Sequence, residues 1–292
     1  MKPKSFAIWA NPRKKEVPGL VHEVMLWAGN NDITLFLPNS LKHLEIASNH
    51  SNFYDSTTPP NVDFLLCLGG DGTLIAGVRI FSKPTIPVLG VHIGGLGFLA
   101  QITPKELTEK LDMIKNDDFT TQERLVLNAK ISNNDHSYFA INDFVVQNET
   151  AYRVTSLSLY IDGKHVSDYK SDGIIISTPT GSTAYALSAG GSIIHPELDL
   201  WNIIPMMSQS LSSRPLIVSN HKSLEIQLIQ GPLDHAMICV DGQNDIPIQY
   251  DDSIVIRKKT TALKIIHPAD NDFYEACREK LGWSLDITAN KN

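Results

Sequence analysis

The sequence predicts an α/β domain with a parallel sheet, followed by a β-rich domain. Three observations support this. Short apolar runs alternate with helically spaced segments over about the first 115 residues, and after Gln122 the apolar spacing changes to strict alternation. The third is the length, because 292 residues lie between the one-domain and two-domain expectations. We expect the first domain at 1–120 and the second at 121–269, with a last helix at about 270–292 that could pack back on the first.

The first domain opens with a β-α-β pattern and continues with a second strand, a glycine-rich turn, a helix and another buried strand. The expected strands are 6–9, 33–37, 64–68 and 87–91, and the expected helices are 17–28 and 74–81. The polar stretch 47–61, rich in Ser, Asn, Thr and Pro, is predicted to be a long mobile loop.

Alternating apolar residues predict strands in the second domain, most clearly at 125–131, 157–161 and 224–228. Turn residues stand between them, such as Asp162-Gly163. The basic run Arg257-Lys258-Lys259 is only three charges long, so we interpret it as a solvated turn.

Composition and charge exclude several classes of protein. A formal charge of −7 provides no basic field for a phosphate backbone, so nucleic acid is not expected as a partner. The three cysteines form no CxxC pair and the ten histidines form no HxxxH or HExxH, which argues against disulfide frameworks and zinc sites. The first apolar run is too short for a signal peptide or a membrane span, so we expect a cytoplasmic protein without a membrane partner.

The first motif with chemical content is Gly69-Gly70-Asp71-Gly72-Thr73, between a strand and a helix. Glycines let backbone N–H groups approach an anion at a helix N-terminus, where the helix dipole also favours negative charge. Phosphates would repel Asp71 unless it binds a metal, orders a hydroxyl or accepts that hydroxyl's proton. The alternative is a turn aspartate that caps Thr73, and the motif alone favours neither interpretation.

The second motif is the block from Ser177 to Gly191, in which six hydroxyls lie within residues 177–185. Short hydroxyl side chains and glycines suit a polar ligand such as a nucleoside, although a hydroxyl-rich helix cap is the commoner meaning of such a composition. The third motif is Asn142-Asp143, which interrupts an apolar strand. Its polar groups need partners, and either a ligand or neighbouring backbone could supply them.

In this order and at this spacing, the three motifs resemble the NAD kinase family. The resemblance extends over nearly the whole chain and includes Leu96-Gly97-Phe98-Leu99, Ser213-Arg214-Pro215-Leu216 and Asp241-Gly242-Gln243. It implies an NAD kinase or diacylglycerol kinase-like architecture. It also implies transfer of a phosphoryl group from ATP to the 2′-hydroxyl of NAD, with a divalent ion, expected to be Mg²⁺, and a homo-oligomeric assembly.

The resemblance also implies a role for each matching residue. Asp71 would accept the proton of the NAD hydroxyl, and Gly69, Gly70, Gly72 and Thr73 would hold phosphates. The residues expected to contact NAD are Asp71, Gly72, Phe98, Asn142, Asp143, Arg153, Lys170, Asp172, Thr180, Thr183, Ala184, Tyr185, Ala186, Leu187, Ser188 and Gln243.

Several positions depart from the family pattern. Asp143 stands where the family often has Glu, while Lys170 and Arg153 stand where Arg and His are more usual. Ser208-Gln209 replaces a proline-histidine pair next to a region that resembles a subunit contact.

Two other functions remain as alternatives. A lipid or sphingoid-base kinase shares the glycine-rich turn but needs an apolar lipid pocket, which the hydroxyl block does not suit. A non-catalytic NAD(P) sensor would use the same pocket, but a carboxylate beside phosphates weakens binding and is useful mainly when a proton moves. A serine hydrolase is not expected, because Ser182 lacks the GxSxG context.

Overall fold

The chain folds into two compact units, each with its own core. The computed structural model describes residues 2–48, 50–82, 85–148, 154–229, 236–249, 252–267 and 273–283. Unit 1 consists of 1–123 together with 263–292, and unit 2 of 124–262. Unit 2 is therefore inserted into the sequence of unit 1.

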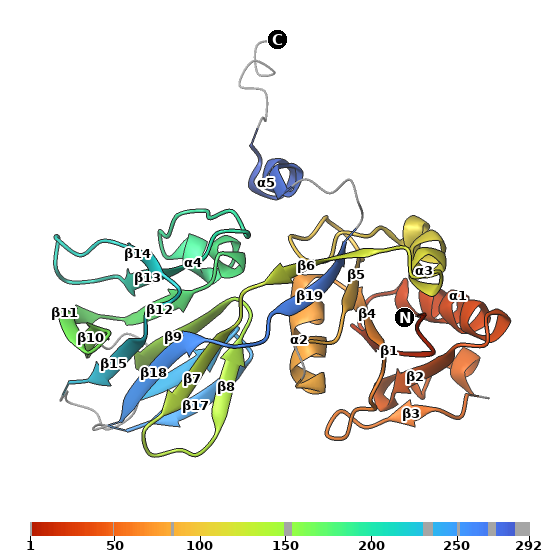
Figure 1. The fold of residues 1–292 in the computed structure, drawn as a ribbon, viewed down its shortest axis with the longest axis horizontal. Helices are drawn as coiled ribbons and strands as arrows, with labels where there is room; N and C mark the ends of the chain where they lie inside the picture. Colours follow the sequence, from red (N-terminus) through yellow and green to blue (C-terminus); the bar gives the residue numbers. More distant parts are fainter. Residues whose placement is uncertain are drawn as a thin grey trace, which may run out of the picture. The chain divides into compact units, whose positions relative to one another are not determined.

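Unit 1 is built on a seven-stranded sheet, seen in Figure 1, with the order β3-β2-β1-β4-β5-β19-β6. The pairs β3-β2, β2-β1, β1-β4, β4-β5 and β5-β19 are all parallel, as the alternation of strands and helices predicts. The strands are β1 (Ser5–Ala10), β2 (Thr34–Pro38), β3 (Phe53–Tyr54), β4 (Phe64–Gly69), β5 (Val88–His92), β6 (Thr120–Arg124) and β19 (Leu263–His267).

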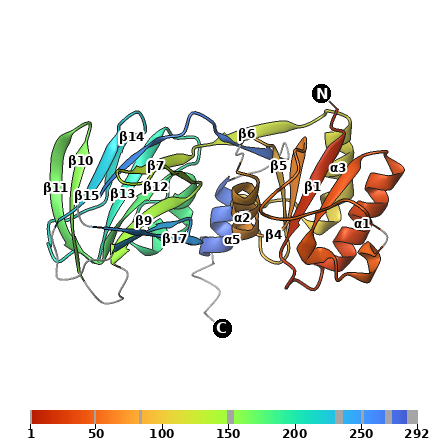
Figure 2. The same cartoon turned by 90° about the horizontal axis from the view of Figure 1, so that it is seen from below.

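Helices cover both faces of this sheet. Figures 1 and 2 show α2 on one face and α1 and α3 on the other. The helices are α1 (Val17–Asn30), α2 (Asp71–Phe81), α3 (Leu107–Lys115) and α5 (Phe273–Leu281), with short 3₁₀ turns η1 (Asn39–Leu41), η2 (Glu45–Ala47) and η3 (Pro104–Glu106).

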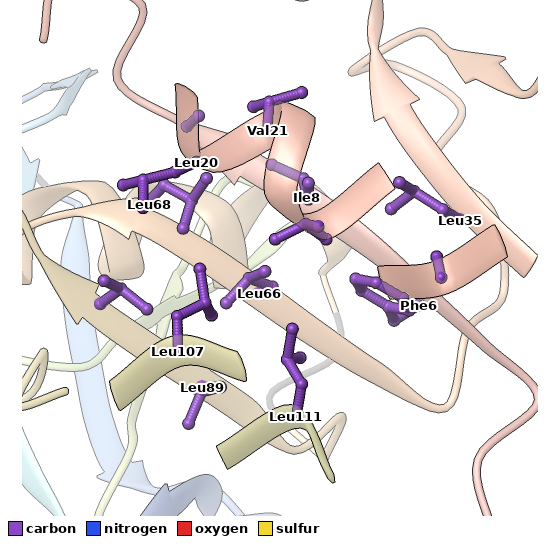
Figure 3. Close-up of a cluster of buried hydrophobic side chains, with 14 of the residues drawn as sticks. Phe6, Ile8, Leu20, Val21, Leu35, Leu66, Leu68, Leu89, Leu107 and Leu111 are labelled. Carbon is purple, nitrogen blue, oxygen red and sulfur yellow. The ribbon is translucent and has the colours of Figure 1, made fainter. Parts of the chain in front are cut away.

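The packing follows from the alternation of side chains along each strand. Figure 3 shows Ile8 and Leu66 pointing from the sheet toward Val21 of α1 and Leu107 of α3, and all four side chains are buried. On the opposite face, Gly77 of α2 comes so close to the sheet that an added Cβ would lie 3.0 Å from the sulfur of Cys67. Burial of β4 on both faces explains why its sequence is apolar at every position.

Two features of unit 1 differ from the sequence analysis. The stretch 47–61, expected to be a long loop, contains β3, and Tyr54 there donates a hydrogen bond of 2.7 Å to the carbonyl of Ile8. Strand β19 lies in the sheet of unit 1, whereas we expected residues up to 269 to belong to the β-rich domain. Alternation identifies a strand but not its partner, and β19 pairs with the distant β5.

Unit 2 contains two six-stranded sheets, with the orders β11-β10-β15-β18-β7-β8 and β14-β13-β12-β9-β16-β17. A short 3₁₀ turn η4 (Thr180–Thr183) and the one-turn helix α4 (Tyr185–Ser188) follow β12. The strands are β7 (Leu127–Ile131), β8 (Ser137–Ala140), β9 (Asp143–Asn148), β10 (Thr155–Ile161), β11 (Lys164–Ser171), β12 (Gly173–Ser177), β13 (Leu200–Met206), β14 (Leu216–Ser219), β15 (Leu224–Leu228), β16 (Ala236–Val240), β17 (Asn244–Ile248) and β18 (Ser253–Lys258).

The inner faces of these two sheets share one hydrophobic core. Leu157 and Ile226 of the first sheet and Phe144 and Trp201 of the second belong to the same cluster, and each is fully buried. The alternating pattern of the sequence therefore correctly predicts the β-rich unit. The expected turn at Arg257-Lys258-Lys259 is wrong, because the first two residues end β18 with exposed side chains.

None of the helices in the described ranges is long and apolar enough to cross a membrane.

Candidate active site

The glycine-rich turn of unit 1 connects β4 directly to α2. Strand β4 ends at Gly69, and α2 begins at Asp71, three residues earlier than the sequence pattern indicates. Gly69 has no space for a side chain, since an added Cβ would lie 2.2 Å from Oγ1 of Thr73. Asp71 therefore stands at the N-terminus of a helix at the carboxyl edge of a parallel sheet, where anions bind in such folds.

The Asp71 carboxylate is held by the backbone of the loop that follows β5. Oδ2 accepts a hydrogen bond from the N–H of Phe98 at 2.8 Å, and Oδ1 accepts from Leu99 at 3.0 Å and from Ala100 at 2.9 Å. The side chain remains 22% exposed. The alternative role, a cap on Thr73, does not describe this carboxylate, because its bonds go to the 98–100 loop and Gly70 occupies the N-cap position.

Gly97 makes this contact possible. An added Cβ at Gly97 would lie 2.2 Å from Oδ1 of Asp71 and 2.6 Å from the carbonyl oxygen of Ala100. A side chain there would displace either the carboxylate or the loop. The motif Leu96-Gly97-Phe98-Leu99 is thus the other half of the Asp71 site, a role that the sequence analysis did not assign to Gly97.

The Asp71 site also includes a lysine that the sequence analysis missed. Nζ of Lys280, from α5, lies 3.1 Å from Oδ2 of Asp71. No local signal could have identified it, because Lys280 stands 209 residues from Asp71.

Unit 2 contains a pocket of about 360 Å³. Four of the residues expected to contact NAD contribute to its wall: Asn142 and Asp143 at the start of β9, and Ala184 and Tyr185 at the start of α4. The remaining lining residues are Val145, Gln147, Cys239, Asp241 and Gly242.

Asp241 organises this pocket. Its carboxylate accepts hydrogen bonds from the backbone N–H groups of Ile141 at 3.1 Å, Asn142 at 2.7 Å and Asp143 at 3.2 Å. Asp241 itself has a left-handed backbone with φ of 50°, in the turn between β16 and β17. Asp241-Gly242-Gln243 is part of the family resemblance, but the backbone partners of Asp241 a hundred residues earlier could not be identified from sequence.

Asp143 is a buried acid in the pocket wall. Its side chain is 2% exposed, and among the described residues Oδ2 has no hydrogen-bond partner. Burial and the nearby negative charge of Asp241 raise the pKa of Asp143 to about 7. A ligand hydroxyl or amine reaching Oδ2 would satisfy this oxygen.

The hydroxyl block mostly holds in place the backbone that forms the pocket. Thr178 donates to the carbonyl of Ile141 at 2.7 Å, and Ser182 donates to the carbonyl of Pro179 at 2.6 Å. Gly181 packs so closely that an added Cβ would lie 2.2 Å from the carbonyl oxygen of Asn142. The block thus holds the Asn142 segment and presents Ala184 and Tyr185 to the pocket.

Other expected contact residues stand elsewhere on unit 2. Lys170 is the second-last residue of β11 and has an exposed side chain. Asp172, just after β11, is also exposed, and Gln243 is exposed in the turn before β17. Thr180 is buried, and its Oγ1 has no partner among the described residues. Thr183 lies in η4, while Ala186, Leu187 and Ser188 lie in α4. Arg153 lies outside the described residues.

Metal-binding side chains do not cluster in the part of the chain that the structure describes, where no group of three His, Cys, Asp or Glu residues could hold an ion.

Comparison with known families supports the two-unit division of the chain. Residues 6–119 match the ATP-NAD kinase N-terminal domain, and residues 141–268 match the ATP-NAD kinase C-terminal domain. The chain is 40% identical over 224 residues to an NAD kinase of Pseudomonas putida (strain GB-1), covering 76% of each chain. It is 41% identical over 226 residues to an NAD kinase of Cellvibrio japonicus (strain Ueda107), covering 76% of this chain and 75% of that one.

Solved structures share the fold. The yeast NADH kinase complexed with NADH superimposes with a TM-score of 0.86 at 24% identity, covering 99% of this chain and 90% of the yeast chain. An NAD kinase from Archaeoglobus fulgidus in complex with ATP superimposes with a TM-score of 0.72 at 22% identity, covering 95% and 97% of the two chains.

The fold and the carboxylate-bearing phosphate turn define a kinase that transfers phosphate to a hydroxyl group. Within that class, the chain belongs to the NAD kinase family. This confirms the resemblance and the fold class predicted from the sequence.

Proposed function

We propose that this protein transfers the γ-phosphoryl group of ATP to the 2′-hydroxyl of the adenosine ribose of NAD, giving NADP and ADP. The observation that carries the proposal is the position of Asp71, a partly exposed carboxylate at the first residue of α2, immediately after the glycines of a strand-to-helix turn. Both the curated relatives cited above are NAD kinases, which supports NAD as the acceptor.

In this reaction Asp71 accepts the proton of the attacking hydroxyl. Phosphoryl transfer needs little covalent help from the protein, so positioning and charge stabilisation dominate. The backbone around Gly69, Gly70, Gly72 and Thr73 holds phosphate, because glycines allow close approach and the N-terminus of α2 favours negative charge. The three N–H groups from the 98–100 loop keep the carboxylate in one orientation, which favours a defined line of attack.

The NAD ligand is proposed to contact the residues implied by the family pattern. Oδ2 of Asp143, which has no partner among the described residues, and the amide of Asn142 suit a ribose or an adenine edge. Ala184 and Tyr185 provide the adjoining wall of the pocket. Phe98 is proposed to stack near adenine. The roles of Thr180, Thr183, Ala186, Leu187, Ser188, Lys170, Asp172, Gln243 and Arg153 remain those expected from the resemblance.

We infer that Mg²⁺ enters with the nucleotide. Mg²⁺ commonly keeps several waters and binds through one or two carboxylates together with substrate phosphates. Residues 69–73 offer only one carboxylate, Asp71, whose lone pairs are taken by three backbone N–H groups and Lys280, so the ion would be held by the triphosphate and water. When bound, such an ion neutralises charge on the phosphates.

The decisive experiment is a coupled assay of the purified protein with NAD, MgATP and an NADP-specific dehydrogenase, alongside the Asp71→Asn variant. We expect NADP from the wild type and a turnover lower by roughly 10²–10⁴ in the variant, the usual cost of a lost general base. Dinucleotide binding of the variant should stay near wild type, while its unfolding midpoint should fall, because the amide NH₂ replaces an acceptor that faces backbone N–H groups. A wild type that releases ADP without NADP, or an active variant, would contradict the proposal.

We also propose that the protein is a homo-oligomer. Met207 is 80% exposed and Leu211 is 93% exposed, and both lie in the β13–β14 connection, which includes the stretch that resembles a subunit-contact region. Light scattering should give a multiple of the 32.3 kDa chain mass, and a fully active monomer would reject this assignment. The sequence has three cysteines far apart and no CxxC pair, which suits a reducing compartment, so the cytoplasm is the proposed location.

A further inference from the structure

The carboxylate of Asp71 has no acceptor position to spare. A carboxylate offers about four lone-pair positions for hydrogen-bond donors. Three are used by the backbone N–H groups of Phe98, Leu99 and Ala100, and Lys280 takes the fourth, 3.1 Å from Oδ2. Before Asp71 can receive a proton from a substrate hydroxyl, one of these donors has to leave.

Lys280 is the donor that can leave at least cost. The three N–H groups belong to a loop fixed to β5, where Gly97 donates to the carbonyl of Ala100 at 3.0 Å and His92 donates to the carbonyl of Ile102 at 2.9 Å. Lys280 is instead a long, flexible side chain that is 36% exposed. Moving its ammonium group needs only rotamer changes.

The packing of α5 keeps Lys280 near the turn even when it leaves Oδ2. Its ammonium lies 4.9 Å from the centroid of the Phe98 ring, and the ring of Phe273, from the first residue of α5, lies 5.9 Å from that of Phe98. Two points of α5 therefore contact the loop that holds Asp71. A cation over an aromatic face is favourably placed, so the Phe98 ring stabilises the ammonium at the same position in which it contacts Oδ2.

The glycine-rich turn itself lacks a cation. Residues 69–73 are three glycines, a threonine and Asp71, so the turn presents a negative charge where phosphates are expected. Many phosphate-binding loops carry a lysine for this purpose. Lys280 supplies the missing charge from the other end of the chain.

We propose that Lys280 is a phosphate-binding residue of the donor site and that the arrival of the triphosphate draws it from Oδ2 of Asp71 onto the phosphate oxygens. The same movement uncovers the lone pair that accepts the hydroxyl proton. Donor binding and exposure of the base are then one event, so the carboxylate is available only when a phosphoryl group is present. The proposal rests on the proposed kinase function of Asp71.

The test is steady-state kinetics of Lys280→Met, with NAD and ATP varied separately. Losing one charge-assisted contact to phosphate predicts a fall of roughly 10- to 100-fold in kcat/KM for ATP, with KM for ATP raised. NAD alone should bind about 5-fold more tightly than to the wild type, because Oδ2 of Asp71 is already free. Lys280→Arg should recover most of the loss, because it keeps the cation. Lys105→Met is the matched control, an exposed lysine of η3 in the same unit, and should behave as wild type.

A second readout is the coupling between the two nucleotides. In wild type, a non-hydrolysable ATP analogue should tighten NAD binding by at least about 5-fold, since it frees the Asp71 oxygen for the ribose hydroxyl. In Lys280→Met the oxygen is free without the analogue, so this tightening should disappear. Neither binding measurement requires turnover.

The outcomes distinguish failure of the proposed kinase function from failure of the phosphate-binding role of Lys280. A wild type that makes no NADP rejects the proposed function. If the wild type is active but folded Lys280→Met keeps its KM for ATP, or Lys280→Arg loses as much as Lys280→Met at the same unfolding midpoint, then only the phosphate-binding role is rejected.

Discussion

At the scale of single residues, two aspartates are held in opposite ways. Asp71 receives three backbone hydrogen bonds and remains partly exposed, whereas Asp143 is buried with an unpartnered oxygen among the described residues. Hydrogen bonds to a carboxylate stabilise its charged form, and burial without partners destabilises it. The two acids therefore have different environments, consistent with the different roles proposed for them, proton acceptance by Asp71 and ligand recognition by Asp143.

The burial of Asp143 predicts that the free energy of unfolding of the nucleotide-free protein depends on pH. Its pKa rises from 3.8 in the unfolded chain to about 7 in the fold, so the stability it contributes is present below pH 4 and is lost as the pH rises through 7. Asp143→Asn carries no charge at any pH. We expect its free energy of unfolding to rise relative to wild type by up to about 4 kcal/mol between pH 4 and pH 8.

Urea unfolding without nucleotide at several pH values measures this difference. Asp135→Asn, which changes an exposed turn carboxyl, is the matched control and should follow the wild-type curve. Parallel curves for wild type and Asp143→Asn would show that the Asp143 carboxyl is not desolvated.

At the scale of elements, the active turn depends on a close fit between the N-terminus of α2 and the loop after β5. Gly97 is the point of closest approach, with no space for a Cβ beside Oδ1 of Asp71. Gly95 lies two residues earlier in the same loop, where an added Cβ meets nothing within 4 Å. The two glycines therefore form a matched pair for testing the fit.

Gly97→Ala should displace the carboxylate and cost roughly 1–3 kcal/mol of stability, as overpacking usually does. Turnover should fall by ~10²-fold, because a shift of about 1 Å in a reacting group has an effect of that size. Gly95→Ala should change both quantities little. The coupled NADP assay and a thermal unfolding scan provide the comparison, and equal effects of the two substitutions would contradict the role of Gly97.

Sequence patterns predicted which segments form helices and strands better than which segments pair with or contact one another. Apolar spacing and glycine turns identify α1, β4 and, in unit 2, β7, β10 and β15, because local geometry alone imposes those periods. They cannot show that β19 pairs with β5 or that Lys280 reaches Asp71, since both depend on contacts between distant parts of the chain. The two-residue β3 was missed because polar flanks hide so short a strand.

Within the site, the residues whose types are chemically unusual were the predictable ones. Asp71 among glycines and Asn142-Asp143 in an apolar strand stand out in any sequence. Asp241 and Gly97 have ordinary turn and loop surroundings in the sequence. Only the structure reveals that the Asp241 carboxylate binds three N–H groups and that Gly97 leaves space for Asp71.

At the scale of the whole molecule, the insertion of unit 2 makes the two units unequal. Unit 2 is one continuous stretch, from 124 to 262, with a complete two-sheet core. The sheet of unit 1 is complete only when β19 takes its place between β5 and β6. We therefore expect unit 2, but not the N-terminal part of unit 1, to fold on its own.

We expect a fragment of residues 124–262 to unfold cooperatively, as measured by circular dichroism on heating. A fragment of residues 1–123 lacks an interior strand and should be largely unfolded and rapidly cleaved by protease, since an open sheet edge leaves backbone groups unpaired. Adding a peptide of residues 263–292 should slow that cleavage. A stable 1–123 fragment would show that β19 is dispensable.

The position of β19 also reverses the order of events on the ribosome. Chains are made at roughly 5–20 residues per second, and the N-terminal part usually folds first. Here the strands at the beginning of the chain must wait on the order of ten seconds for β19 to be translated, while unit 2 already has its full sequence. The nascent N-terminal sheet, with its apolar β4 and β5, is thus the part that most needs a chaperone during synthesis.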